Sequence, residues 1–193
     1  MKSGNIMIVG VGGQGTLLAS KMLGRIFLDQ GVDVKVSEVH GMSQRGGSVV
    51  TYVRYGDKVY SPIIDRGEAD LILSFELLEA ARWLEYLRPD GTIITNSAGI
   101  NPMPVVSGAT EYPKDLVKKI QDLGVNIDAF DALDLAVKAG SSRAVNIVLL
   151  GRLSKRFDLG IDEWLKALEA SVPSRFLEMN KKAFLLGRGE EDV

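Results

Sequence analysis

The stretch IMIVGVGGQGTLLASKML, from Ile6 to Leu23, joins an apolar run to a cluster of glycines and then to a helix-like pattern. The β-branched run predicts a strand over Asn5 to Gly10, and the apolar spacing that follows predicts a helix over Gln14 to Gln30. Gly31 suits the end of that helix. Alternating residues from Val32 to Val39 predict a second strand, which completes a βαβ unit with a right-handed crossover.

The glycine cluster fits the GxGxxG pattern of a strand–helix turn, in which backbone N–H groups at a helix N-terminus bind a pyrophosphate. The motif positions are Gly10, Gly12 and Gly15. Glu38 follows near the end of the second strand, where dinucleotide enzymes place an acid for the ribose hydroxyls. Gly13 and Gln14 make the turn unusual, since the Gln14 amide could point into the site. Three interpretations stay open: a nicotinamide or flavin, another anion or a partner's backbone, and glycines needed only for close packing of strand and helix.

A second glycine-rich segment, EVHGMSQRGGSV, runs from Glu38 to Val49. It follows the second strand, so we expect it at the same sheet edge as the first glycine turn. Arg45 offers a guanidinium fork beside the unhindered amides of Gly46 and Gly47, a combination that suits phosphate or carboxylate. Each part also has a structural interpretation: a salt bridge for Arg45, entry to a hairpin for the glycines, and capping or packing for His40.

Further along the chain, β-rich runs on both sides of Gly56 and Asp57 predict a hairpin and therefore a mixed sheet. The proline-rich residues 101–113 are expected to form a surface loop, with a short strand at Val105 and Val106 as one option. Asp162 is a candidate N-cap. Other expected strands cover residues 70–74, 92–95 and 125–130, and expected helices cover residues 76–87, 114–123, 132–139, 143–157, 162–171 and 174–186.

The fold class that follows is α/β: one three-layer Rossmann-like domain over residues 1–193, with a largely parallel, mixed sheet and a helical C-terminal region.

A formal charge of −2 argues against binding to nucleic acid, which needs a basic face. With no cysteine, the chain cannot form a disulfide, hold a thiolate-ligated iron–sulfur cluster or use a cysteine nucleophile. His40 is the only imidazole. The N-terminal residues lack a signal-peptide pattern and no apolar run is long enough to span a membrane, so a cytoplasmic protein is expected.

Five segments together resemble one family, and the resemblance runs from about Asn5 to Gly187. They are GVGGQGTLLASKML, SEVHGMSQRGGSV, KVYSPII, AVNIVLLG and RFLEMNKKAF. The family is the gamma-type domain of 2-oxoacid:ferredoxin oxidoreductases, and the likeness is greatest to its members that act on arylpyruvates such as indolepyruvate. The resemblance implies an oxidative decarboxylation in which an arylpyruvate, coenzyme A and oxidised ferredoxin give aryl-acetyl-CoA, carbon dioxide and reduced ferredoxin.

The resemblance also implies how the work is divided. Thiamine diphosphate and iron–sulfur clusters belong to a larger alpha-type catalytic subunit, and the lack of cysteine and of a GDG-type thiamine motif here agrees with that. This chain then carries no cofactor of its own and has no catalytic residue or metal site, but shares in holding coenzyme A. The residues expected to do so are the turn, Gly10, Gly12, Gly13, Gln14 and Gly15, and the loop, Ser43, Gln44 and Arg45.

Two other functions fit parts of the sequence. A stand-alone NAD- or FAD-dependent Rossmann oxidoreductase would need a proton-transfer residue beside the cofactor, for which only His40, Glu38 and Tyr52 are candidates. An adaptor without a ligand would instead present a contiguous exposed apolar face to its partners.

Overall fold

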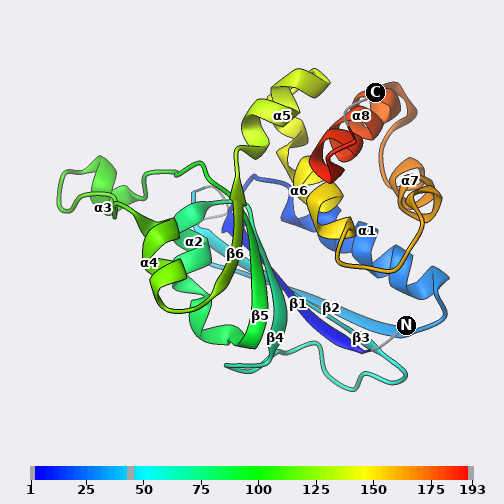
Figure 1. Ribbon diagram of the computed structural model, residues 1–193, viewed down its shortest axis with the longest axis horizontal. Coiled ribbons are helices and arrows are strands. Elements are labelled where there is room, and N and C mark those ends of the chain that lie inside the picture. The colour runs from blue at the N-terminus through cyan, green and yellow to red at the C-terminus, as the bar shows by residue number, and fades with distance from the viewer. Residues whose placement is uncertain (1–2, 43–45, 191–193) are drawn as a thin grey trace.

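The computed structural model describes residues 3–42 and 46–190. Its centre is a six-stranded sheet with the order β2-β3-β1-β4-β5-β6 (Figure 1). Five strands run in the same direction, and β3 alone is antiparallel to both of its neighbours. The strands are β1 (Gly4–Val11), β2 (Asp33–His40), β3 (Ser48–Gly56), β4 (Ala69–Ser74), β5 (Leu87–Asn96) and β6 (Asn126–Phe130). The mixed, largely parallel sheet that the sequence predicts is confirmed.

Helices cover both faces of the sheet, which gives three layers (Figure 1). On one face lie α1 (Thr16–Asp29), α5 (Ala132–Ala139), α6 (Val145–Ser154), α7 (Ile161–Glu169) and α8 (Leu177–Arg188). On the other face lie α2 (Leu77–Arg82) and α4 (Leu116–Asp122). Shorter helices are α3 (Met103–Val106) and the 3₁₀ turns η1 (Leu84–Tyr86), η2 (Ser142–Ala144) and η3 (Ser174–Phe176).

The central strand β1 explains why the opening apolar run decides the fold. Ile6 and Ile8 pack into the core beneath α1, while Met7 and Val9 pack into the smaller core beneath α2. A strand buried on both faces has to be apolar along its whole length rather than on alternate residues. The run therefore places β1 in the middle of the sheet, with a helical layer on each side.

The hairpin expected at Gly56 and Asp57 is wrong. β3 continues through Gly56, and its hairpin partner is β2, with Asp33 opposite Gly56 and His40 opposite Val49. The connection of this hairpin therefore lies between His40 and Ser48. After Gly56 the chain forms an irregular segment up to β4, because Pro62 has no N–H to give to a ladder and Tyr60 is largely exposed rather than packed.

Other element boundaries also differ from expectation. The short strand considered at Val105 and Val106 is instead the helix α3. Asp162 is not an N-cap, because α7 begins at Ile161 and Gly160 occupies the cap position. The helix expected over residues 76–87 ends at Arg82 and continues as η1. None of the helices in the described residues is both long and apolar enough to cross a membrane.

Candidate functional site

The glycine turn lies between the end of β1 and the start of α1, at the carboxyl edge of the parallel strands. Gly13 and Gly15 both have left-handed backbone, with φ of 99° and 88°. Within the described residues, the backbone N–H groups of Gly13 and Gly15 have no acceptor in the protein. They lie next to the N-terminus of α1, whose dipole favours a negative charge. The turn therefore presents two backbone donors beside a helix N-terminus.

The side chain of Gln14 is turned inward and holds the turn together. Its Oε1 accepts a hydrogen bond from the N–H of Val11 at 2.7 Å, and its Nε2 donates to the carbonyl of Phe75 at 3.1 Å. These two bonds tie the end of β1 to the end of β4. In this arrangement Gln14 positions the backbone of the turn, and its amide does not reach outward.

Two of the motif glycines are needed for close packing. A Cβ at Gly10 would lie 2.8 Å from Oε1 of Gln14 and 3.1 Å from Cβ of Phe75. A Cβ at Gly15 would lie 2.6 Å from Nδ2 of Asn146, a buried residue at the start of α6 that donates to the Gly15 carbonyl at 3.4 Å. A Cβ at Gly13 would meet nothing within 4 Å. Gly10 and Gly15 therefore serve packing, while Gly13 leaves backbone open on the outer side.

The second glycine-rich segment meets the first, as expected from their common sheet edge. The N–H of Gly12 donates to the carbonyl of Gly47 at 2.9 Å, and the N–H of Gly46 approaches the carbonyl of Gly12 at 3.5 Å. The turn and the loop are therefore joined by backbone hydrogen bonds. Three predicted site residues, Ser43, Gln44 and Arg45, lie outside the described residues.

A hollow of about 440 Å³ opens between the glycine turn and the end of β2. Its lining is Gly12, Gly13, Gly15, Thr16, Leu17, Glu38, His40 and Val49. The Glu38 carboxylate accepts from the hydroxyls of Thr16 at 3.3 Å and Thr51 at 3.2 Å. His40 is exposed, and its Nδ1 lies 3.1 Å from the carbonyl of Gly41. A phosphate in this hollow would be near the Glu38 carboxylate, so it would need a cation as well as the backbone amides.

A second hollow, of about 190 Å³, also lies at the carboxyl edge of the sheet. It is lined by Val11, Gly46, Ser48, Glu76, Leu78, Glu79, Arg82, Ile100 and Pro102. Glu79 is buried, and its carboxylate accepts from the Ser48 hydroxyl at 2.5 Å and the Trp83 indole at 3.3 Å. The Arg82 guanidinium lies 3.3 Å from the same carboxylate and balances its charge.

Glu76 lies deepest in this second hollow, with 1% of its surface exposed. One carboxylate oxygen caps α2 by accepting from the N–H of Glu79 at 2.8 Å. The other accepts from the N–H of Ile100 at 2.9 Å and the hydroxyl of Tyr112 at 2.6 Å. Burial, together with this hydrogen bond to Glu76, raises the pKa of Tyr112 above its usual value. Glu76 therefore acts as the N-cap of α2.

Sequence reasoning missed Glu79, Tyr112 and Ser48. The spacing of Glu76 and Glu79 across the first turn of a helix is the local signal that could have found the acidic pair. Tyr112 gives no such signal, because its contact with Glu76 joins residues 36 positions apart.

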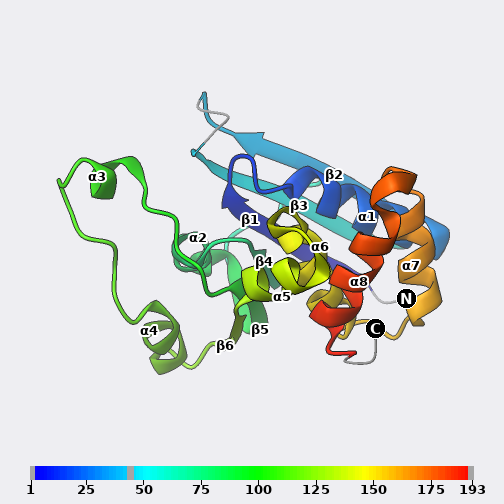
Figure 2. The same cartoon turned by 90° about the horizontal axis from the view of Figure 1, so that it is seen from above.

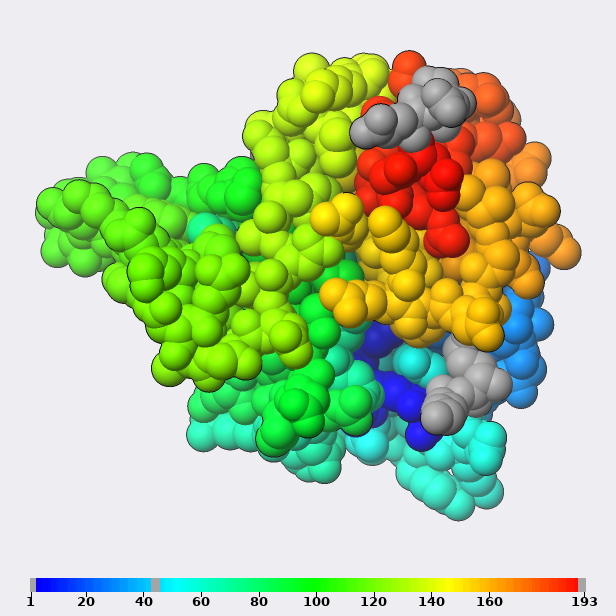
Figure 3. All heavy atoms as spheres, in the orientation of Figure 1, coloured from blue at the N-terminus to red at the C-terminus, as the bar shows by residue number. Residues whose placement is uncertain are grey.

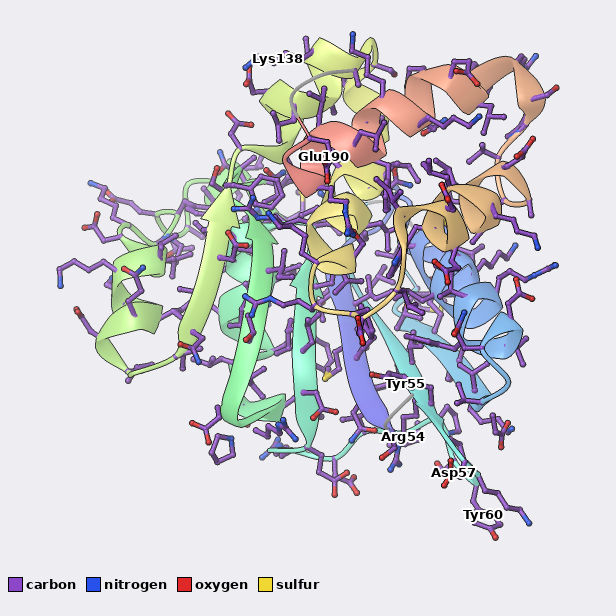
Figure 4. All side chains as sticks on the ribbon, turned by 45° about the vertical axis from the view of Figure 1, so that its right-hand side comes forward. Arg54, Tyr55, Asp57, Tyr60, Lys138 and Glu190 are labelled. Atoms are coloured by element: carbon purple, nitrogen blue, oxygen red, sulfur yellow. The ribbon has the colours of Figure 1, made fainter. Side chains whose placement is uncertain are left out.

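A larger hollow, of about 950 Å³, lies at the opposite edge of the sheet. Figure 4 labels Arg54 and Tyr55 near the end of β3, and Asp57 and Tyr60 in the segment that follows. Two of the cations there have polar partners: Arg54 donates to the Asn5 side chain and to the carbonyl of Ile63, and Arg88 pairs with Asp70 at 2.6 Å. The third, Lys58, has its ammonium 5.0 Å from the centre of the Tyr60 ring. Burial raises the pKa of Tyr55 to about 12. Arg54 and Arg88 therefore serve the fold rather than an anion.

The geometry weighs against a dinucleotide site of the usual kind. In that site the second strand lies next to the first, so that its acid can reach the ribose. Here β3 lies between β1 and β2, and the Glu38 carboxylate is hydrogen-bonded to two threonines. No group of three or more potential metal ligands occurs in the described part of the chain. The chain also has no cysteine, so its residues do not fit an iron–sulfur cluster.

Comparison with known proteins agrees with this geometry. The family model described as pyruvate ferredoxin/flavodoxin oxidoreductase matches residues 5–190. The chain is 46% identical to the indolepyruvate oxidoreductase subunit IorB of Thermococcus kodakarensis, over 97% of this chain and 95% of the relative. It is 44% identical, over the same shares, to the IorB subunit of Pyrococcus horikoshii. The gamma subunit of a keto/oxoacid ferredoxin oxidoreductase from Geobacter sulfurreducens has the same fold, with a TM-score of 0.71, 22% identity and 97% of each chain covered. The chain therefore belongs to the pyruvate ferredoxin/flavodoxin oxidoreductase family, where it matches separate small subunits along nearly their whole length.

Proposed function

We propose that this chain is the small subunit of a 2-oxoacid ferredoxin oxidoreductase that acts on arylpyruvates such as indolepyruvate. The observation that carries the proposal is the 46% identity to an indolepyruvate oxidoreductase subunit over nearly the full length of both chains. The partner is a larger catalytic subunit that holds thiamine diphosphate and the iron–sulfur clusters. Those groups supply the decarboxylation and the transfer of electrons to ferredoxin.

The task of this chain in that complex is to share the binding of coenzyme A at the carboxyl edge. The N–H groups of Gly13 and Gly15 and the N-terminus of α1 are donors for a phosphate of the coenzyme. Gln14 keeps these donors in place through its bonds to Val11 and Phe75. Arg45 supplies the cation, because the Glu38 carboxylate in the same hollow would otherwise repel the phosphate. Ser43 and Gln44 complete the loop around it.

The test is a reconstituted complex of this chain with the larger subunit. Arylpyruvate- and coenzyme A-dependent reduction of ferredoxin should require both chains. Replacing Arg45 by alanine should raise the KM for coenzyme A by roughly 10- to 100-fold, which corresponds to the loss of a charge-assisted hydrogen bond of about 1.5 to 3 kcal/mol. Arg66→Ala is the matched control, since Arg66 is exposed and paired with Glu85 away from this edge.

The possible results separate the two parts of the proposal. An unchanged KM for coenzyme A in the Arg45→Ala complex would reject the binding role but leave the subunit role intact. A complex without 2-oxoacid activity, or an isolated chain that oxidises a substrate with NAD or FAD alone, would overturn the subunit role itself.

A further inference from the structure

Residues 97–113, which connect β5 to α4, form an arm that projects away from the layers of the fold. Both ribbon views show α3 on this arm at a distance from the other helices (Figures 1 and 2). In the space-filling view the arm forms a green lobe at one side of the molecule (Figure 3). A projecting segment of this length in a compact protein usually has a functional reason.

The arm has no charged residue from residue 97 to residue 110, and its one charge, Glu111, lies near its C-terminal end. A quarter of all residues in the chain are charged, yet residues 97–110 include none. Three apolar side chains of the arm face solvent: Ile100 is 41% exposed, Met103 74% and Val106 65%. Exposed apolar side chains gathered on an uncharged stretch of a projection are typical of a surface that is covered by another protein.

The arm is also held in a defined shape before any partner arrives. The single carboxylate oxygen of Glu76 that binds both the Ile100 N–H and the Tyr112 hydroxyl fixes the two ends of the arm to the same point. The ring of Tyr112 lies against Gly99, where a Cβ would be 2.7 Å from the ring. Around α3, the Pro104 carbonyl accepts from the N–H of Ala109 at 2.9 Å and from the Ser107 hydroxyl at 3.1 Å. A preorganised arm loses less conformational entropy on docking than a flexible one.

The position of the arm indicates which partner it meets. Ile100 and Pro102, at the base of the arm, line the same hollow as Gly46 and Ser48 of the second glycine-rich segment. A protein that covers the carboxyl edge therefore also lies against the arm. Under the proposed function, on which this step rests, that protein is the larger catalytic subunit.

A second copy of this chain fits the arm less well. Its apolar tip needs an uncharged recess, and each of the three hollows described above is lined by carboxylates. Covering these carboxylates with Met103 or Val106 would remove part of their hydration, which opposes docking. We propose that the arm inserts Met103 and Val106 into an apolar recess of the larger catalytic subunit and is the main contact that holds the two subunits together.

The experiment measures binding between this chain and the purified larger subunit by biolayer interferometry. The variant is Met103→Glu with Val106→Glu, which places two charges in the proposed contact. The matched control is Leu28→Glu with Val137→Glu, because these residues of α1 and α5 are 59% and 58% exposed and lie outside the arm. Thermal melts of both variants establish that they are folded.

The arm variant should bind the larger subunit about 30-fold more weakly than the wild type does, or more weakly still, because it has lost an apolar anchor. The affinity of the control variant should stay within about threefold of the wild type. Binding of the arm variant within threefold of wild type would overturn the inference and leave the proposed function standing. An isolated chain whose self-association is abolished by the arm substitutions would also overturn it, in favour of a second copy. If the wild-type form of this chain does not bind the larger subunit at all, the proposed function fails, and this inference fails with it.

Discussion

Replacing Gly15 by alanine tests whether the glycine turn is packed against α6 as the structure shows. Two effects add up. Alanine in left-handed backbone at φ 88° costs about 1 to 2 kcal/mol relative to glycine. The new Cβ would lie 2.6 Å from Nδ2 of Asn146, which must then move away from the Gly15 carbonyl and strain its bond from the N–H of Ile147. Disturbing buried polar groups in this way costs about 1 to 3 kcal/mol, so the free energy of unfolding should fall by about 2 to 5 kcal/mol in total.

A double-mutant cycle with Asn146→Ala separates the two effects. With the Asn146 amide removed, the added methyl group has space, and only the backbone cost remains. The double variant should therefore be more stable than the sum of the single variants predicts, by about 1 to 2 kcal/mol. Gly13→Ala is the matched control, because Gly13 has the same type of backbone but no atom within 4 Å of its Cβ position. Its effect should simply add to that of Asn146→Ala.

The assay is urea denaturation followed by the fluorescence of Trp83 and Trp164, with slopes compared to check that each variant unfolds in one step. Additivity of Gly15→Ala and Asn146→Ala within about 0.5 kcal/mol would refute the reasoning, because residues in contact are expected to couple. The same result would remove packing as a reason for a glycine at this position and leave its left-handed backbone as the explanation.

Two further predictions concern other parts of the fold. Burial raises the pKa of Tyr55 to about 12 and that of Tyr112 above its usual value, so both should ionise above the usual pH for tyrosine in an alkaline titration of tyrosinate absorbance. Because the folded protein holds these protons more tightly than the unfolded chain, its stability should fall as pH rises from about 10 towards 12. Ionisation of Tyr55 and Tyr112 near pH 10 in the folded protein would contradict this. Arg152→Ala should lower the free energy of unfolding by about 1 kcal/mol, since the guanidinium makes a bidentate pair with Asp128 that is only partly exposed. Urea denaturation at low and high salt measures this loss of stability, and Arg152→Lys should retain part of the stability that Arg152→Ala loses. An unchanged free energy of unfolding in Arg152→Ala would show that this ion pair does not stabilise the fold.

The sequence was sufficient for the features that depend on local pattern. The glycine turn could be placed between β1 and α1 because a fully apolar run followed by a 3.6-residue period has few other interpretations. The joint position of the two glycine-rich segments at one edge followed from the direction of the strands before them. The hydrogen bond between Gly12 and Gly47 confirms that placement.

Features that depend on distant partners could not be predicted in the same way. The residues of β3 favour a strand, but no local signal says that it inserts between β1 and β2. Gly56 and Asp57 are residues that suit a tight hairpin turn, so a hairpin there agreed with the sequence equally well. The inward orientation of Gln14 depends on the carbonyl of Phe75, 61 residues away. The hydrogen bond between Glu76 and Tyr112 likewise joins residues that only the folded chain brings together.

The place of β1 between β3 and β4 has a consequence for biosynthesis. The first strand to leave the ribosome cannot complete its ladders until Ser74, its last partner in the sheet, has also emerged. Until then an apolar ribbon with two open edges is exposed in the nascent chain, where it invites wrong pairing. The early helix α1 covers only one side of this ribbon, so assembly of this protein in the cell depends on how quickly translation carries the chain past β4.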